Sequence, residues 1–310
     1  MNYKDILTFN LQTLVKKYKK SDRFKANAYA KALSQLPGPP ILSYDDVKDV
    51  GGDKTKAKLK LIIETNQNLQ EVDDYLNDGS FVIIDTLQKI HGVGPAKAHE
   101  LVNKHTIQSI DDLKQHPELL NNIQRMGLQY FEDIEKKIPF TEMVKHEAFL
   151  KKHLEHIRFT IAGSYRRKCD QSSDIDVLVT GDSNRLQDVI TKLQDSKYIN
   201  TEAVFAHGEV KFMGLCKLPR HKTYRRIDVL FTPPHEYPFA LLYFTGNFKF
   251  NVEMRKHALS KGYTLNEQGL KRSGNGEAET THHIIPTFTT EEDIFEFLAY
   301  PYKTPEDRVV

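Results

Sequence analysis

Tryptophan is absent from this sequence of 310 residues, and cysteine is scarce. The lack of tryptophan decides nothing about the fold, but two cysteines, Cys169 and Cys216, cannot form a disulfide framework. No apolar run is long enough to span a bilayer, and the first residues lack the pattern of a secretory signal. We therefore expect an intracellular protein in a reducing compartment, with no membrane partner.

A strong net charge is also missing, since the formal value is +2, but the charges are unevenly distributed. Residues 1–60 carry thirteen lysines and arginines against six acids, whereas residues 61–78 carry five acids and no base. Basic surface is thus concentrated in the N-terminal part, where it could bind a polyanion. The length of the chain allows two to four modules.

Two acids alternate with apolar residues in the middle of the chain. Asp174 and Asp176 lie in the run 174–179, and alternate side chains of a strand share a face, so both carboxylates point one way. Two close carboxylates repel each other, and a hard cation such as Mg²⁺ removes the repulsion. A third acid, Asp228, lies in the apolar strand expected at 225–231. The alternative is an acidic strand edge that only faces solvent.

A Gly-Ser pair precedes these acids. Gly163 and Ser164 follow the apolar run 159–162, which predicts a strand, a tight turn and the start of a helix. Backbone N–H groups at such a helix start can hold phosphate, and Arg166 and Arg167 add fixed positive charge.

Residues 3–35 are expected to form two helices, because leucines recur at helical spacing in the first part and alanines favour a helix in the second. A lysine-rich run, 16–25, lies between them. Such a run is typical of a solvated face, but Phe24 and Tyr29 could stack on bases while the lysines hold phosphates. The run alone leaves both interpretations open.

Two glycine turns each open a lysine-bearing helix in the first hundred residues. Gly51 and Gly52 form the first turn, and residues 92–95, with Pro95 in the first helical turn, form the second. The second resembles a helix-hairpin-helix, an element that grips the DNA backbone without reading sequence. A plain packing turn is the alternative for either copy.

The Gly-Ser turn, the spaced Asp174 and Asp176 and the distant Asp228 together resemble the nucleotidyltransferase superfamily. Within it, the chain resembles family X of the DNA polymerases, close to DNA polymerase beta. The segments that carry this resemblance extend over nearly the whole chain and lie at 25–29, 92–95, 125–139, 163–176, 211–214, 225–228 and 243–259.

The resemblance implies an α+β fold with a nucleotidyltransferase palm. Helical lyase-like and helix-hairpin-helix domains would precede the palm, and a C-terminal nucleotide-closing subdomain would follow it. The implied modules are a lyase-like DNA-end-binding domain at 1–78, a helix-hairpin-helix duplex-binding subdomain at 79–138, a catalytic palm at 139–235 and a nucleotide-selecting subdomain at 236–310.

The implied reaction is DNA-templated gap filling in base excision repair, in which a primer 3′-hydroxyl attacks the α-phosphate of a dNTP. The resemblance assigns two Mg²⁺ ions, with Mn²⁺ as an alternative, to Asp174, Asp176 and Asp228. It assigns nucleotide binding to Ser164, Arg167, Ser172, Tyr243, Phe244, Gly246 and Asn251. It assigns DNA contacts to Lys25, Tyr29, Lys54, Gly92, Gly94, Lys97, Arg226 and Arg255, with a monovalent cation at the hairpin turns.

The N-terminal module implies a second activity, excision of a 5′-deoxyribose phosphate through a lysine Schiff base. The lysine must be neutral to attack, so it needs cationic neighbours or partial burial. With the apolar side of the helix buried, Lys54 and Lys58 lie one turn apart on another face, and we take Lys58 as the nucleophile. Lys56 and Lys60 are alternatives, and all these lysines could instead only solvate the helix or attract DNA.

Two other functions compete with templated gap filling: template-independent nucleotide addition, and DNA-end binding with weak catalysis. The short turn at 206–209 favours the templated reaction. The chain departs from the family pattern at Lys168, where glycine is usual, and at Phe140, where a basic residue is usual. We expect gapped or nicked DNA and a dNTP as partners, a monomer, and a nuclear location by resemblance, with a viral or cytoplasmic site as alternatives.

Overall fold

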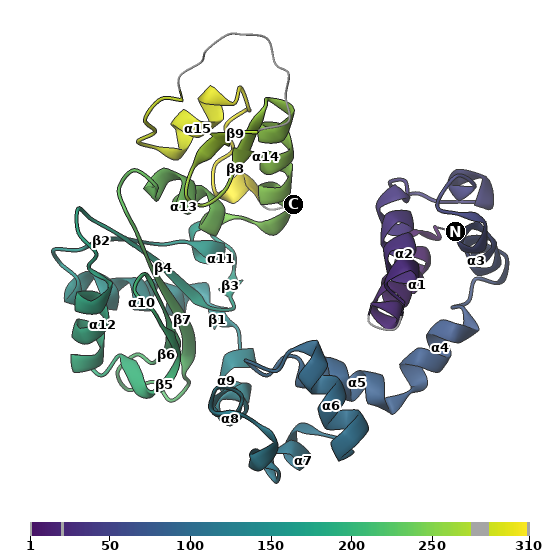
Figure 1. The fold of residues 1–310 in the computed structure, drawn as a ribbon, viewed down its shortest axis with the longest axis horizontal. Helices are drawn as coiled ribbons and strands as arrows, with labels where there is room; N and C mark the ends of the chain where they lie inside the picture. The colour runs from purple at the N-terminus through teal and green to yellow at the C-terminus, as the bar shows by residue number, and fades with distance from the viewer. Residues whose placement is uncertain (1, 20–21, 274–284, 309–310) are drawn as a thin grey trace. The chain divides into compact units, whose positions relative to one another are not determined.

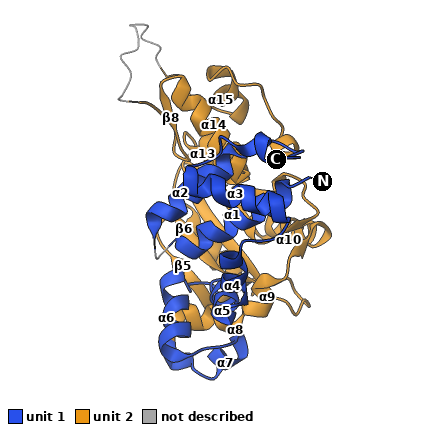
Figure 2. Cartoon of the chain, turned by 90° about the vertical axis from the view of Figure 1, so that its right-hand side faces the viewer, with its two compact units in different colours: residues 1–119 blue, residues 120–310 orange. Residues whose placement is uncertain are grey.

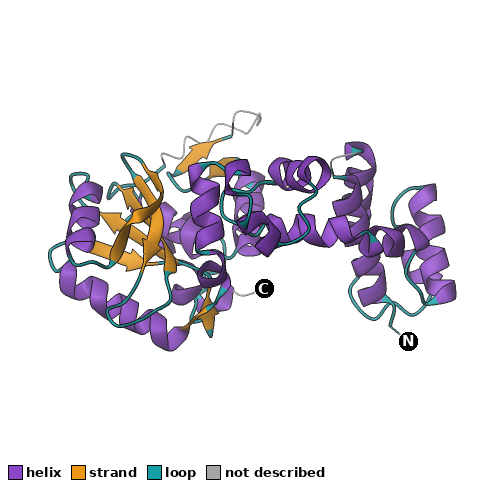
Figure 3. Cartoon of the chain, turned by 90° about the horizontal axis from the view of Figure 1, so that it is seen from below, coloured by secondary structure: helices purple, strands orange, loops and turns teal. Residues whose placement is uncertain are grey.

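The computed structural model describes residues 2–19, 22–273 and 285–308. It divides into two compact units, residues 1–119 and residues 120–310, shown in blue and orange in Figure 2. Within the described residues, every strand belongs to the second unit, while helices occur in both (Figure 3). An α+β architecture with a helical N-terminal part is therefore confirmed.

The first unit is built from helices. They are α1 (Lys4–Tyr18), α2 (Arg23–Gln35), α3 (Asp53–Thr65), α4 (Gln70–Asn77), α5 (Gly79–Leu87), α6 (Pro95–His105) and α7 (Ile110–Lys114), with the 3₁₀ turns η1 (Tyr44–Val47) and η2 (Pro117–Leu119).

The two helices expected at 3–35 are confirmed as α1 and α2. The side chain of Asp22 caps α2 by accepting a hydrogen bond of 3.0 Å from the backbone N–H of Lys25. Apolar residues of α1, α2, α3 and α4 share one core, in which Leu11 and Leu59 are fully buried. Burial of this side of α3 leaves Lys54 exposed and Lys58 half-buried on another side of the helix.

The second unit contains the strands. They are β1 (Ile138–Pro139), β2 (Arg158–Ile161), β3 (Gln171–Ser172), β4 (Ile175–Thr180), β5 (Ile199–His207), β6 (Lys211–Cys216), β7 (Arg225–Thr232), β8 (Tyr263–Leu265) and β9 (Leu270–Arg272). The helices are α8 (Asn122–Gln129), α9 (Phe131–Glu135), α10 (Phe140–His153), α11 (Gly163–Arg166), α12 (Leu186–Asp195), α13 (Tyr237–Thr245), α14 (Phe248–Ser260), α15 (Glu291–Phe297) and the 3₁₀ turn η3 (Glu306–Arg308).

Five strands form the main sheet in the order β2-β4-β7-β6-β5 (Figure 1). The central pair β4 and β7 is parallel, and the other pairs are antiparallel. Val177 and Val229 lie on the face that α10 and α12 cover, together with the buried leucines and valines of those helices. The alternate residues Leu178 and Leu230 lie on the opposite face and pack against α13. The period of two thus separates the face covered by α10 and α12 from the face that carries the acids and packs against α13.

The border between the two units falls inside the segment 79–138 that the sequence predicts as one module. Its last part packs on the sheet, because Ile123 and Met126 of α8 and Tyr130 lie against Phe205 of β5. The four-module division therefore stays a prediction, while contacts within the chain group residues 120–138 with the sheet.

The cysteines Cys169 and Cys216 are not bonded to each other. Across the described ranges, none of the helices combines the length and the apolar character needed to cross a membrane.

Candidate active site

The parallel strands β4 and β7 bring two predicted catalytic acids together. Asp176 and Asp228 are direct partners in the register, so their side chains lie beside each other on one face of the sheet. Asp174 stands just before β4, and its carboxylate is ion-paired with Arg226 of β7. The guanidinium of Arg226 also lies 4.0 Å from Oδ1 of Asp228. Arg226, predicted to contact DNA, thus contacts the carboxylates here.

Burial and mutual repulsion make it unfavourable for both carboxylates to be ionised at the same time. Burial, followed by the nearby charge of Asp228, raises the pKa of Asp176 to about 6. Oδ1 of Asp228 is buried and has no hydrogen-bond partner among the described residues, and Nζ of Lys211 lies 3.8 Å from Oδ2. A buried carboxylate oxygen without a donor suits a divalent cation.

In the part of the chain that the structure describes, no three His, Cys, Asp or Glu side chains are gathered into a complete metal-binding cluster. Two carboxylates, Asp176 and Asp228, are nevertheless enough for Mg²⁺, which commonly takes its other ligands from water and substrate phosphates. The donor set therefore fits Mg²⁺, and the role of Asp174 as a ligand stays a prediction.

The predicted strand, turn and helix start at the Gly-Ser pair are confirmed as β2 and α11. Gly163 has φ +59°, and a Cβ atom added there would collide with Oδ2 of Asp176, so the backbone approaches the carboxylate closely only because this residue is glycine. The hydroxyl of Ser164 donates a hydrogen bond of 2.8 Å to Oγ of Ser172. The two serines predicted to bind phosphate are thereby brought together.

Arg166 and Arg167 connect α11 to the C-terminal helices. Nη1 of Arg166 donates to Oγ1 of Thr245 at 2.8 Å, and Nη2 lies 2.5 Å from Oε2 of Glu291. Glu291 is buried and has a second ion pair, at 2.8 Å, with the fully buried Arg308. Arg167 donates to the backbone carbonyl of Thr245. The structural role of Arg166 was not predicted, because Glu291 lies far away in the sequence.

The aromatic pair before the Thr-Gly turn adjoins the acids. Phe244 lines a small cavity of about 30 Å³ together with Asp176, Asp228 and Lys211. A cavity of this size has room for about one water molecule or ion. The rings of Tyr243 and Phe244 meet edge to face at 5.1 Å.

The remaining residues predicted to contact the nucleotide and the template strand gather around Tyr243. Nδ2 of Asn251 donates a hydrogen bond of 2.8 Å to the carbonyl oxygen of Tyr243. The guanidinium of Arg255 lies 4.9 Å from the centre of the Tyr243 ring and 3.7 Å from Glu267. Gly246, with φ +63°, follows α13 and lies beside Arg167 and Asn251.

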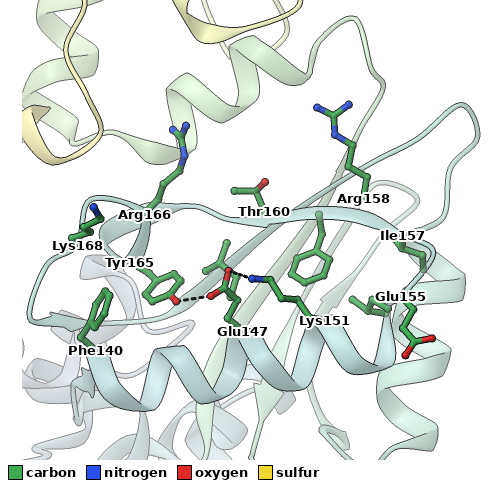
Figure 4. Close-up of a pocket in the computed structure, with 13 residues that line it drawn as sticks. Phe140, Glu147, Lys151, Glu155, Ile157, Arg158, Thr160, Tyr165, Arg166 and Lys168 are labelled. Atoms are coloured by element: carbon green, nitrogen blue, oxygen red, sulfur yellow. Dashed lines mark hydrogen bonds and ion pairs between the residues drawn. The ribbon is translucent and has the colours of Figure 1, made fainter.

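A larger cavity of about 680 Å³ lies between α10, β2 and α11 (Figure 4). Within it, Glu147 accepts a hydrogen bond of 2.8 Å from the hydroxyl of Tyr165 and pairs with Lys151 at 2.9 Å. Phe140 contributes an aromatic ring 5.2 Å from that of Tyr165. None of the three aspartates is among its lining residues, so the cavity is separate from the acids.

The departure at Lys168 has a conformational consequence. Its φ is +57°, the left-handed region in which a side chain is strained and glycine is not. Nζ of Lys168 pairs with Glu306 at 2.5 Å.

A second cluster of charges lies in the first unit. Nζ of Lys58 is ion-paired with Glu71 of α4, and burial together with the charges of Lys17 and Lys25 lowers the pKa of Lys58. This is the environment that the predicted nucleophile needs. The acidic stretch 61–78 was visible in the sequence, but not the pairing of Glu71 with Lys58.

Lys25 and Tyr29 border this cluster. Nζ of Lys25 lies 4.8 Å from the centre of the Tyr18 ring, and the ring of Tyr29 lies 5.9 Å from that of Tyr18. The sequence left open whether the ring of Tyr29 stacks on bases. Only 6% of Tyr29 is exposed and its ring belongs to the core of the unit, so the structure disfavours that interpretation. Phe24 is 90% exposed.

The two predicted glycine turns have the expected backbone. Gly51 and Gly92 have φ of +74° and +83°, and Gly52 and Gly94 cap the N-termini of α3 and α6. Lys97, in the first turn of α6, is paired with Glu100 at 3.0 Å.

Comparisons with known proteins match most of the chain. Family models match in three consecutive parts: the fingers domain of DNA polymerase lambda at residues 85–135, the DNA polymerase beta palm at 137–234 and the DNA polymerase beta thumb at 240–309.

Relatives extend the match to the first unit. DNA polymerase lambda of Arabidopsis thaliana is 30% identical over 307 residues, which cover 91% of this chain and 57% of the relative. DNA polymerase lambda of Rattus norvegicus is 29% identical over 329 residues, covering 99% and 56%. DNA nucleotidylexotransferase of Xenopus laevis is 24% identical over 320 residues, covering 89% and 60%. The chain thus spans little more than half the length of these relatives.

Proposed function

Because this chain belongs to family X of the DNA polymerases, we propose that it is a DNA-templated DNA polymerase that fills short gaps during base excision repair. The observation that carries the proposal is the pairing of Asp176 with Asp228 on one face of the parallel strands β4 and β7, beside the glycine turn at Gly163. In the reaction, the 3′-hydroxyl of a primer attacks the α-phosphate of a dNTP, and pyrophosphate leaves.

Asp174, Asp176 and Asp228 would hold two Mg²⁺ ions, and Mn²⁺ is the alternative. Bound divalent cations lower the pKa of the attacking hydroxyl and neutralise charge on the triphosphate. The carboxylate of Asp228, which has a buried oxygen without a hydrogen-bond donor among the described residues, is suited to receive the hydroxyl proton. Arg226, which is ion-paired with Asp174, positions that carboxylate.

The nucleotide would lie along α11 and the end of α13. Ser164 and Ser172, joined by a hydrogen bond, are suited to the triphosphate, with Arg167 beside them. The other proposed contacts are Tyr243, Phe244 and Gly246 at the sugar, Asn251 at the base and Arg255 at the template strand.

We further propose a 5′-deoxyribose phosphate lyase activity in the first unit, with Lys58 as the nucleophile. A half-buried lysine with two cationic neighbours loses its proton more readily than a free one, and the neutral amine is the form that attacks an aldehyde. Lys25, Lys54 and the hydroxyl of Tyr29 would hold the phosphate of the substrate.

The four predicted modules remain part of the proposal. The glycine turns at 51–52 and 92–95 would contact the backbone of gapped or nicked DNA through their N–H groups, with Lys97 nearby and a monovalent cation at the turns. We also propose that the protein is a monomer and lies in the nucleus, which is a reducing compartment.

Primer extension on a one-nucleotide gap, with each dNTP supplied in turn, tests the polymerase. Incorporation of the complementary nucleotide alone supports templated synthesis. Indiscriminate tailing would instead support the activity that the name of the Xenopus relative states. The turn between β5 and β6, closed by a hydrogen bond of 2.8 Å from Gly208 to Lys211, favours the templated reaction, because it leaves no loop there to replace a template. DNA binding without incorporation would reject both.

A further inference from the structure

A carboxylate from α4 contacts the lysine proposed as the Schiff-base nucleophile. Nζ of Lys58 is ion-paired with Oε1 of Glu71, and about a quarter of each side chain is exposed, 27% for Lys58 and 26% for Glu71. The pair is therefore partly shielded from water but still accessible to a substrate.

Glu71 is held in place by two residues of α1. The hydroxyl of Tyr18 donates a hydrogen bond of 3.0 Å to Oε2 of Glu71, and Nζ of Lys17 donates one of 2.9 Å to its backbone carbonyl. One carboxylate oxygen is thus bound to Tyr18 while the other faces Lys58. An exposed ion pair contributes little to stability and is not usually fixed by further hydrogen bonds. A catalytic carboxylate has to be held in one orientation, which these hydrogen bonds achieve.

Partial burial and the positive charges of Lys17 and Lys25 disfavour the ammonium form of Lys58, while the Glu71 carboxylate favours it. A proton shared between two such groups can move from one to the other when a substrate displaces their contact.

We infer that Glu71 is the acid–base residue of the lyase reaction that is proposed above for Lys58, and on which this inference depends. Glu71 first takes the proton of the Lys58 ammonium. The neutral amine adds to C1 of the open-chain deoxyribose phosphate, and the carboxylic acid of Glu71 protonates the C1 hydroxyl, which leaves as water and gives the iminium.

The regenerated carboxylate then removes a proton from C2. The electron pair of that C–H bond forms the C2=C3 double bond, the C3–O bond breaks, and the DNA 5′-phosphate leaves with its electron pair. Water hydrolyses the iminium and releases the unsaturated aldehyde. C2 lies two bonds from Nζ of Lys58, so a carboxylate that touches Nζ is within reach of the C2 proton.

The test separates imine formation from elimination in the full-length chain on a gap that carries a 5′-deoxyribose phosphate. Borohydride trapping measures the imine, and release of the sugar from labelled DNA measures elimination. Glu71→Gln is expected to slow imine formation and to lower the elimination rate about 10²-fold, as for loss of a general base, so that the adduct that does form persists and stays trappable. Glu64→Gln, which removes an exposed carboxylate paired with Lys60 of α3, is the matched control and should leave both rates unchanged.

A second variant guards against a purely structural effect. Glu71→Ala should also lose elimination, and added formate should restore at least a tenfold gain that wild type does not show. Gap filling, measured on the same samples, should stay at the wild-type rate.

The outcomes distinguish the two proposals. If wild type forms no trappable adduct, the lyase activity and the role of Glu71 are both rejected. If wild type traps and Lys58→Ala does not, but Glu71→Gln eliminates at the wild-type rate, the lyase stands and only the role of Glu71 is overturned.

Discussion

The two candidate sites hold opposite charges in a similar way. On the sheet, Asp176 and Asp228 are forced together by the register of two strands, and the pKa of Asp176 rises to about 6. In the first unit, Lys17 and Lys25 lie near Lys58, and its pKa falls. In each case the fold places like charges close together and partly out of water, which disfavours the charged form of one group, Asp176 or Lys58.

The difference lies in how each site is balanced. Lys58 has Glu71 as a counter-ion from another helix, whereas Asp228 keeps a buried oxygen without a donor in the described chain. The lysine site can therefore exchange protons within itself, and the acid site needs a cation to be complete. Four changes test this comparison.

The largest effect is expected from Asp228→Ala. Single-turnover insertion on a one-nucleotide gap should slow at least ~10³-fold, or roughly 4 kcal/mol of transition-state stabilisation, because the carboxylate proposed to bind metal and to accept the proton is removed. Borohydride trapping should be unchanged. Asp188→Ala, which removes an exposed acid of α12 paired with Arg185, is the control. Insertion at a near wild-type rate would reject the assignment of Asp228.

The converse change is Lys58→Ala. Trapping of the DNA adduct should fall to background, because Lys58 is the amine whose pKa is lowered by burial and by the charges of Lys17 and Lys25, while gap filling keeps its rate. Lys60→Ala, on the same helix but 56% exposed at its side chain, is the matched control and should trap normally. Equal trapping by wild type and Lys58→Ala would show that another lysine is the nucleophile.

Gly163→Ala should damage the acid site alone. The added Cβ collides with the Asp176 carboxylate at a φ that disfavours side chains, so we expect a loss of about 2 kcal/mol in the free energy of unfolding and slower insertion. Urea unfolding measures the loss. Gly181→Ala, where the nearest atom is 3.7 Å away and φ is not positive, should change the stability little. Wild-type stability of Gly163→Ala would mean that the turn adjusts freely.

The smallest effect concerns pH. The pKa of Asp176 is raised in the folded chain, so its stabilising contribution is complete below the unfolded value of 3.8 and is lost as pH rises through about 6. Urea unfolding with a chelator present should therefore show that lowering the pH from 7 to 5 stabilises wild type by about 1 kcal/mol more than Asp176→Asn. Parallel pH profiles of the two proteins would contradict the raised pKa.

Protonation of Asp176 should also weaken metal binding. Below pH 6 the proton on Asp176 competes with Mg²⁺, so the apparent affinity should fall about tenfold for each further pH unit.

Local patterns in the sequence predicted much of the acid site. The alternation around Asp176 places its carboxylate opposite the packed face, and the Gly-Ser turn predicts a close approach of the backbone, since both depend on neighbours in the chain. The pairing of Asp174 with Arg226 could not be predicted, because it depends on which side chains meet between two strands 52 positions apart.

The same limit applies to the first unit. The apolar side of α3 correctly placed Lys58 outside the core, but Glu71 reaches it through the packing of α4, which no local pattern encodes. Tyr29 shows the same limit: the basic run left open whether its ring is exposed, and the packing of α2 in the core buries it.

The double pairing of Glu291 has a consequence for motion. A buried carboxylate left with no counter-ion would cost several kcal/mol, which would lock α11 to α15 if Arg166 were the sole partner. Arg308, in the same C-terminal part, is also ion-paired with Glu291. Loss of the Arg166 ion pair would therefore not leave the buried carboxylate without a counter-ion. The charge of Glu291 is therefore neutralised within the C-terminal part itself, and breaking the contact between α11 and α15 costs less free energy than it would with Arg166 as the sole partner.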